Sequence, residues 1–161
     1  MVEKLNLLDS LIKNDSIKVG YTAKDWKDAI HEACKPLVDK RIINWNYYDA
    51  ILESTAKHGP YYIIIEGLAM PHASSTENAV LSNGFSLLTL TKPIYFENDE
   101  RKVQIIMVLA AKDGETHTAV AIPQICAVFE DPANVEKVAN AKNKEEIIKL
   151  IKSIDYTKYL S

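Results

Sequence analysis

The chain has 161 residues, of which 47% are hydrophobic and 25% charged, and its formal net charge is -3. This length and composition suit a single domain, residues 1–161, that buries a core of its own. The interleaving of basic with acidic residues argues against a nucleic-acid-binding protein. No apolar run approaches the roughly 20 residues that a membrane-spanning helix needs, and the N-terminus shows no secretory signal pattern. We therefore expect a cytoplasmic protein without membrane insertion.

The first half of the chain carries helix patterns around one strand pattern. Apolar residues recur every three or four positions in the helices and alternate with polar ones in the strand. Thr22 with Asp25 suits the start of the second helix, and Gly59 with Pro60 suits the end of the third. The predicted elements are a helix over residues 7–13, a strand over 16–21, a helix opened by Thr22 with a buried stripe up to Val38, and a helix over 45–57 capped by Asn44 or Asn46.

The second half begins with apolar, β-rich runs that are typical of strands buried on both faces. It returns to helix patterns after Gly114, where Pro123 predicts a kink or a late start. Asp131 followed by Pro132, and Asn143, suit the starts of the last two helices. The predicted strands are residues 61–65, 84–90 and 103–111, with a short edge segment over residues 93–96.

Strands that are apolar on both faces need helices on both sides of the sheet. We therefore expect an α/β fold: a single domain with a mixed, mostly buried central sheet of about four to five strands flanked by helices on both faces. Cys34 and Cys126 lie far apart in the sequence on apolar helix faces. We expect two buried, reduced thiols there, not a disulfide or a metal pair.

The search for chemistry centres on histidine, because the sequence has no P-loop, nucleophile elbow, Cys-x-x-Cys or His-Glu-x-x-His pattern. His72 stands in a small, glycine- and proline-bearing loop after a predicted strand, a common place for a functional side chain. Pro71 restricts the backbone before it, and Ala73, Ser74 and Ser75 leave room for an anion and offer it donors. Neutral imidazole is also a good nucleophile at cytosolic pH.

The other histidines have weaker contexts. His117 follows a strand at the expected N-terminus of a helix, where the field favours anions and a neutral imidazole. It could meet the Pro-His loop at one sheet edge, or be an ordinary surface residue near a cap. His58 ends a helix with Ser54 on the same face, and could be no more than a C-terminal dipole partner. His31 is expected in solvent, and Glu66 either orients a histidine or is simply exposed.

Residues 67–72, Gly-Leu-Ala-Met-Pro-His, resemble the phosphorylation-site signature of the mannitol/fructose-type enzyme IIA family of the bacterial sugar phosphotransferase system. Residues 116–131 are similar to the family's second active-site histidine segment, and the likeness extends over roughly residues 5 to 152. Residues 58–62, His-Gly-Pro-Tyr-Tyr, are most similar to the ascorbate-specific branch. One departure is Ser54, which stands where mannitol and fructose members carry an arginine, a strong bidentate phosphate donor.

The resemblance implies a phosphoryl carrier. Nε2 of His72 would accept the phosphoryl group of phospho-HPr and pass it to a cysteine of the cognate enzyme IIB. That protein serves a membrane enzyme IIC in the uptake of a sugar, here ascorbate. His117 would stabilise the phosphoryl group, no metal or other cofactor is needed, and a homodimer stays open. The candidate phosphate ligands are Ala73, Ser74, Ser75, His58 and Ser54.

Two alternatives stay open. Nitrogen-type relatives of this fold carry the histidine but signal through protein contacts, so the role could be regulatory. A metal-dependent hydrolase could use His72 and His117 with Asp113 or Glu66. The sequence offers no short-spaced ligand pair for a tetrahedral zinc site, which disfavours the hydrolase.

Overall fold

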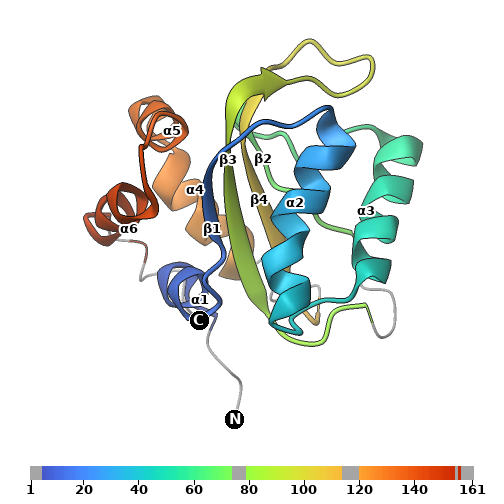
Figure 1. The fold of residues 1–161 in the computed structure, drawn as a ribbon, viewed down its shortest axis with the longest axis horizontal. Helices are drawn as coiled ribbons and strands as arrows, with labels where there is room; N and C mark the ends of the chain where they lie inside the picture. The colour runs from blue at the N-terminus through green and yellow to red at the C-terminus, as the bar shows by residue number, and fades with distance from the viewer. Residues whose placement is uncertain (1–4, 74–78, 114–119, 155, 157–161) are drawn as a thin grey trace.

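The computed structural model describes residues 5–73, 79–113, 120–154 and 156. In these parts of the chain, a four-stranded sheet is covered by helices on both faces (Figure 1). The elements follow one another as α1 (Leu7–Lys13), β1 (Ile17–Tyr21), α2 (Trp26–Asp39), α3 (Trp45–His58), β2 (Gly67–Ala69), β3 (Gly84–Ile94), β4 (Val103–Ala110), α4 (Ile122–Phe129), α5 (Pro132–Ala139) and α6 (Lys144–Lys152).

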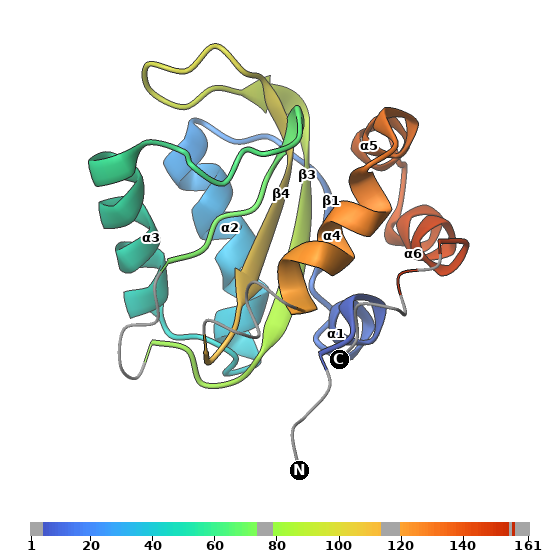
Figure 2. The same cartoon turned by 180° about the vertical axis from the view of Figure 1, so that it is seen from behind.

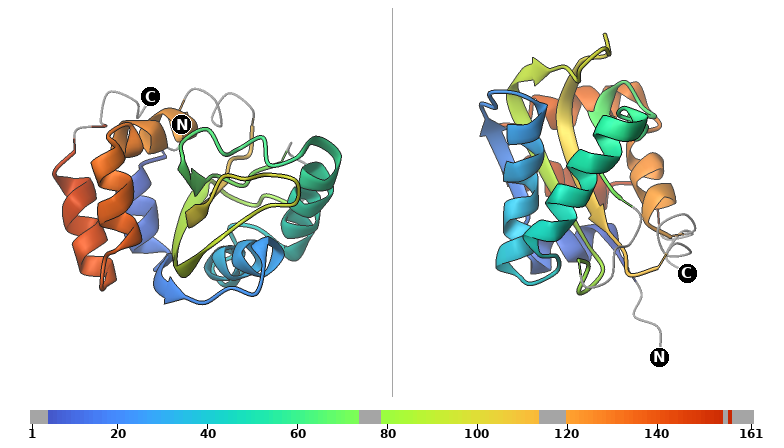
Figure 3. Two further views of the ribbon diagram at one scale, coloured as in Figure 1. Left: turned by 90° about the horizontal axis from the view of Figure 1, so that it is seen from above. Right: turned by 90° about the vertical axis from the view of Figure 1, so that its right-hand side faces the viewer.

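The sheet is mixed and has the strand order β1-β3-β4-β2. β3 and β4 form an antiparallel hairpin at its centre, β1 runs parallel to β3, and β2 runs parallel to β4. α2 and α3 cover one face, while α1, α4, α5 and α6 cover the other (Figure 3). Because both faces are covered, β4 and most of β3 are buried, which explains their nearly continuous apolar sequences. The predicted fold class is confirmed.

Short polar side chains start most of the helices. Each accepts a hydrogen bond from a backbone N–H of the first turn, which the helix itself cannot satisfy. α3 ends at Gly59, whose φ of 73° lies in the region that favours glycine. α4 begins late, at Ile122, with Pro123 in its first turn, which confirms one of the two predicted effects of this proline. The capping residues are Asn6, Asp25, Asn44, Asp131 and Asn143.

One predicted strand is wrong. Residues 61–65 form no strand; they turn away from the end of α3, and the N–H of Tyr61 donates to the carbonyl of Gly59 over 2.9 Å. The edge strand β2 is instead Gly67–Ala69, a short segment inside the Gly-Leu-Ala-Met-Pro-His run. Residues 61–65 are apolar for another reason: the buried Tyr62 and Ile63 pack into the core from the turn.

Other boundaries and burial expectations need smaller corrections. Thr22 does not cap α2; Asp25 does, because its carboxylate accepts from the N–H of Asp28 over 2.8 Å. Residues 93 and 94 are not a separate edge segment but the end of β3. Cys34 is buried and Cys126 is half-buried, and neither forms a disulfide. Burial raises the pKa of both thiols, which keeps them protonated.

Candidate functional site

His72 follows β2, where the chain leaves the sheet beside β4. β2 runs parallel to β4, with Ala69 paired to Ile106. Beyond the strand, the N–H of Leu109 in β4 still donates to the carbonyl of Pro71 over 3.3 Å. The loop that carries the histidine is therefore a continuation of the sheet edge, and its backbone is fixed on that side.

The imidazole of His72 is half-buried, and its Nδ1 lies 2.7 Å from the backbone carbonyl of Met70. A carbonyl oxygen only accepts hydrogen bonds, so Nδ1 must carry a proton and donate it. In the neutral ring, this assignment leaves the basic lone pair on Nε2. Burial lowers the pKa of His72 below its usual value, and the hydrogen bond to Met70 opposes this shift in part. The geometry thus favours a neutral ring with Nε2 as its nucleophilic atom.

Two tyrosines that follow α3 enclose the imidazole. The ring of Tyr61 stands edge-on to His72, with centroids 5.5 Å apart and planes at 89°, and its hydroxyl donates to the backbone carbonyl of His72. The ring of Tyr62 lies 6.2 Å from the imidazole on a tilt of 55°. The N–H of Met70 also donates to the carbonyl of Tyr62 over 3.3 Å. These aromatic rings create the half-buried environment that disfavours the imidazolium.

A third tyrosine, Tyr47, fixes the far side of the loop from within the core. Its fully buried hydroxyl donates to the carbonyl of Leu109 over 2.7 Å and accepts from the N–H of Ala73 over 3.3 Å. Sequence reasoning missed Tyr47, because a hydroxyl that contacts distant backbone leaves no spacing pattern. Tyr61 had a partial signal, because it lies in residues 58–62, the segment most similar to the ascorbate branch.

Ser54 and His58 reach the same place through Tyr61. The Ser54 hydroxyl donates to the Tyr61 hydroxyl over 3.2 Å, and the exposed ring of His58 lies edge-on to that of Tyr61, with centroids 6.4 Å apart. The structure therefore brings these two residues and His72 around one tyrosine. Their predicted contact with a phosphoryl group remains a prediction, as does that of Ala73, whose N–H faces the Tyr47 hydroxyl here.

The remaining predicted residues divide into those outside the described parts of the chain and those away from His72. Ser74, Ser75 and His117 are outside the described residues, so their roles remain predictions. Glu66 is exposed at the opposite end of β2 from the histidine, which agrees with the simpler of its two readings. His31 is exposed, as expected, and its ring stacks on Trp45 at 4.4 Å.

The structure gives the hydrolase alternative no support in the parts of the chain it describes. Among these residues, no group of three or more histidine, cysteine, aspartate or glutamate side chains could hold a metal ion. His117, one of the ligands of that alternative, is not among them.

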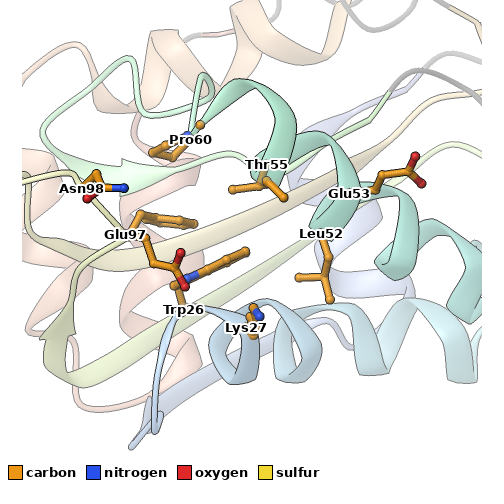
Figure 4. Close-up of a pocket in the computed structure, with 11 residues that line it drawn as sticks. Trp26, Lys27, Leu52, Glu53, Thr55, Pro60, Glu97 and Asn98 are labelled. Atoms are coloured by element: carbon orange, nitrogen blue, oxygen red, sulfur yellow. The ribbon is translucent and has the colours of Figure 1, made fainter.

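A pocket of about 590 Å³ opens between α2, α3 and the turn that joins β3 to β4 (Figure 4). Trp26, Thr55 and Phe96 are among its lining residues, and His72 is not. The pocket reaches the histidine only indirectly, through Tyr62. The Tyr62 ring lies 5.8 Å from that of Phe96, and its hydroxyl hydrogen-bonds that of Thr55 over 2.7 Å. His72 therefore does not line this pocket.

Residues 10–154 match the family described as "Phosphoenolpyruvate-dependent sugar phosphotransferase system, EIIA 2". The chain belongs to this family. Such EIIA components are phosphoryl carriers, so the protein is a phosphotransferase component of a sugar phosphotransferase system (PTS). In the described part of this EIIA, no helix combines the length and the apolar character that crossing a bilayer requires.

Individual relatives agree with the family over nearly the whole chain. The EIIA is 38% identical over 158 residues to the ascorbate-specific PTS system EIIA component of Mycoplasma pneumoniae, covering 98% of this chain and 99% of the relative. A crystal structure of a candidate PTS IIA protein from Streptococcus mutans superposes with a TM-score of 0.90 at 42% identity, over 98% of this chain and 99% of that one. The mannitol enzyme IIA of Escherichia coli, solved in complex with its phosphorylated enzyme IIB, has the same fold, with a TM-score of 0.76 at 21% identity over 86% and 95% of the two chains.

Proposed function

We propose that this EIIA carries the phosphoryl group on Nε2 of His72, taking it from phospho-HPr and passing it to a cysteine of an enzyme IIB. The observation that supports this choice of atom is the 2.7 Å contact of Nδ1 with the Met70 carbonyl. It assigns the proton to Nδ1 and the lone pair to Nε2. Burial keeps the ring neutral, and only the neutral ring can attack phosphorus.

The proposed transfer is an in-line exchange between two imidazoles. The bond from phosphorus to the donor histidine breaks as the bond to Nε2 of His72 forms, and the donor leaves as a neutral ring. The His72 ring keeps its Nδ1 proton and becomes formally cationic, so the Met70 carbonyl then stabilises positive charge. In the second step a cysteine thiolate attacks phosphorus, and the ring returns to its neutral form. Positioning and charge stabilisation supply most of the catalysis in such transfers.

The surrounding ligands of the phosphoryl group belong to the same proposal. His117 would donate to a phosphoryl oxygen, and Ser54, His58, Ala73, Ser74 and Ser75 remain the candidate phosphate ligands. The roles of His58 and Ser54 are supported by their contacts with Tyr61, which lies beside the imidazole. Because the donor is itself a reactive phosphohistidine, neither a nucleotide nor a metal ion is required.

The sugar in this proposal is ascorbate, because the Mycoplasma pneumoniae relative bears that specificity in its name at 38% identity. The E. coli mannitol enzyme IIA, solved with its phosphorylated enzyme IIB, is a precedent for the acceptor. A membrane enzyme IIC would complete the relay, with the protein itself in the cytoplasm.

The decisive test is labelling from phosphoenolpyruvate through enzyme I and HPr, with His72→Gln compared with His31→Gln. The wild type and His31→Gln should take up acid-labile, base-stable phosphate, because His31 is an exposed residue of α2 that stacks on Trp45. His72→Gln should take up none, and His117→Ala should label slowly. An unlabelled wild type, or a His72→Gln variant labelled as fast as the wild type, would contradict the proposal.

The acceptor and the sugar need a separate experiment. Phosphorylated protein should transfer its label to the cysteine of an ascorbate enzyme IIB faster than to that of a mannitol enzyme IIB. Labelled protein that transfers to neither would contradict the transport role and favour the regulatory alternative. Faster transfer to the mannitol protein would reject ascorbate while keeping the carrier function.

A further inference from the structure

Tyr61 joins α3 to the His72 loop through both its backbone and its side chain. Its N–H donates to the carbonyl of Gly59 over 2.9 Å, so the turn that ends α3 fixes the position from which the side chain extends. Tyr61 is 41% exposed, and water could satisfy its hydroxyl. Burial therefore does not explain why the hydroxyl bonds to the protein, because it could bond to water instead.

The hydroxyl of Tyr61 lies in the middle of a short hydrogen-bond chain. The backbone carbonyl of His72 can only accept, so the single phenolic proton points at it. Ser54 must then donate to the Tyr61 oxygen, across 3.2 Å. Donation to an oxygen that is itself donating strengthens both bonds. The chain thus runs from α3 through a side chain to the peptide that follows the nucleophile.

The ring of Tyr61 adds a second constraint on the same residue. It stands edge-on to the imidazole at 5.5 Å, an arrangement in which a positive ring edge meets a negative ring face. The Tyr62 ring packs against that of Tyr61, at 5.0 Å between centroids. One side of the His72 ring is thus bounded by a perpendicular aromatic ring, while Nδ1 is held by the Met70 carbonyl. Tyr61 thus contacts both the backbone and the ring of His72.

We propose that Tyr61 is a positioning residue for His72, and that Ser54 acts on the nucleophile through Tyr61. The inference rests on the proposed function of His72. Without the hydroxyl, the peptide after His72 keeps the 3.3 Å hydrogen bond from the Ala73 N–H to Tyr47 but loses the one at its carbonyl. It is then held less firmly, and the Nδ1 contact with Met70 becomes one of several ring orientations. Phosphoryl transfer would slow because Nε2 is aligned less often, while docking of the donor would be unchanged.

The test compares Tyr61→Phe and Ser54→Ala with Tyr95→Phe, a matched control at an exposed tyrosine in the turn after β3. Tyr61→Phe should lower the maximal rate of labelling from phospho-HPr by about three- to tenfold, the range expected for one net hydrogen bond, with unchanged KM. Ser54→Ala should have a smaller effect. Adding it to Tyr61→Phe should change nothing further, because the two act in series.

A second readout does not depend on transfer at all. Long-range proton–nitrogen NMR of the His72 ring should show the Nδ1–H tautomer in the wild type and in Tyr95→Phe. Tyr61→Phe should shift the ring toward a mixture of tautomers. If Tyr61→Phe folded poorly, the same measurements on Ser54→Ala would decide.

Three results would overturn the inference: wild-type maximal rates in both Tyr61→Phe and Ser54→Ala, a rise in KM alone, or an Nε2–H tautomer in the wild type. A rise in KM alone would make Tyr61 a partner contact. A wild type that takes no label would reject the proposed function instead, and the NMR comparison would still report on Tyr61.

Discussion

The imidazole of His72 is held in a half-buried site, and burial costs its charged form more than its neutral form. Its pKa in the folded protein is therefore lower than in the unfolded chain. Between those two values the unfolded chain binds the proton more readily, so acid favours unfolding there. The stabilisation is complete above the unfolded pKa, near 6.5, and is lost as the pH falls toward the lowered value.

The lowered pKa of His72 predicts that this residue makes its own contribution to the loss of stability in acid. Between about pH 7.5 and about pH 5.5, the free energy of unfolding of the wild type should fall by more than that of His72→Gln, because glutamine does not titrate. His31→Gln, at an exposed histidine, is the matched control for the loss of an imidazole. Urea denaturation at the two pH values measures this. Equal losses in the wild type and His72→Gln would contradict the lowered pKa.

The sequence could single out His72 as a candidate but not the side chains that hold it. A histidine in a Pro-His loop is visible because the loop is local, and the resemblance to the enzyme IIA signature is written in consecutive residues. Tyr47 contacts Ala73 and Leu109 across large separations in the chain, and such contacts exist only after folding. One tyrosine among eight has no local mark that distinguishes it.

At the scale of elements, Gly67 joins the edge strand to a helix. Its φ is 92°, and a Cβ built there would lie 3.0 Å from Cγ1 of Val135 in α5. The positive φ favours glycine because other residues are strained there. The close approach of β2 to α5 favours glycine because a Cβ would crowd Val135. Gly20 in β1 provides a matched comparison, because its φ is 77° and nothing lies within 4 Å of its Cβ position.

Gly67→Ala should therefore destabilise the protein by more than Gly20→Ala does. Backbone strain alone should cost about 1–2 kcal/mol in each, and the contact with Val135 should add about 1 kcal/mol more in Gly67→Ala. Urea denaturation of both variants gives the difference, and Val135→Ala in the Gly67→Ala background should reduce it. Equal losses in the two glycine variants would mean that α5 yields to the added methyl group.

Residues 61–65 show why one element was assigned wrongly from the sequence. An apolar, β-rich run of five residues is equally compatible with a buried strand and with a turn that inserts its side chains into the core. The strand that does form, Gly67–Ala69, has only three residues, two of them small, so it shows no alternating or apolar strand pattern. Caps such as Asp131 and Asn143 were predictable, because capping is a local interaction.

At the scale of the whole molecule, one buried side chain ties the beginning of the described chain to its second half. The Oε1 atom of Gln124 in α4 accepts from the N–H of Leu7 over 2.7 Å, and its Nε2 donates to the carbonyl of Leu5 over 2.7 Å. Gln124 is fully buried. The two helices α1 and α4 lie on the same face of the sheet (Figure 2). The amide satisfies the N–H of Leu7, which α1 leaves unpaired at its start, and the carbonyl of Leu5, just before the helix.

Gln124→Met should loosen α1 while leaving the central hairpin intact. It keeps much of the volume but removes both hydrogen bonds, so we expect a loss of about 1–3 kcal/mol in the free energy of unfolding. Hydrogen exchange should accelerate at the amides of α1 and not at those of β3 and β4. Gln104→Met, in the half-exposed position of β4, is the control. Unchanged exchange in α1 would show that apolar packing alone holds it.

The mixed fold class followed from apolar runs, but the strand order did not. The antiparallel pair β3–β4 is local, whereas β1 joins β3 and β2 joins β4 from far along the chain. No residue pattern in β1 or β2 specifies which neighbour it takes. Register and order are set by how α1, α2 and α5 fill the two faces together, which is a property of the assembled core.

The way in which the backbone of residues 70–73 is anchored bears on attempts to transplant the reactive loop. Four of its backbone groups, one in each residue, bond to residues outside the loop: Tyr62, Leu109, Tyr61 and Tyr47 in turn. A hexapeptide grafted onto another scaffold would bring His72, the proposed nucleophile, without any of these supports. A portable version would have to carry the end of β4 and both ends of α3 with it, which makes the smallest transferable unit most of one face of the domain.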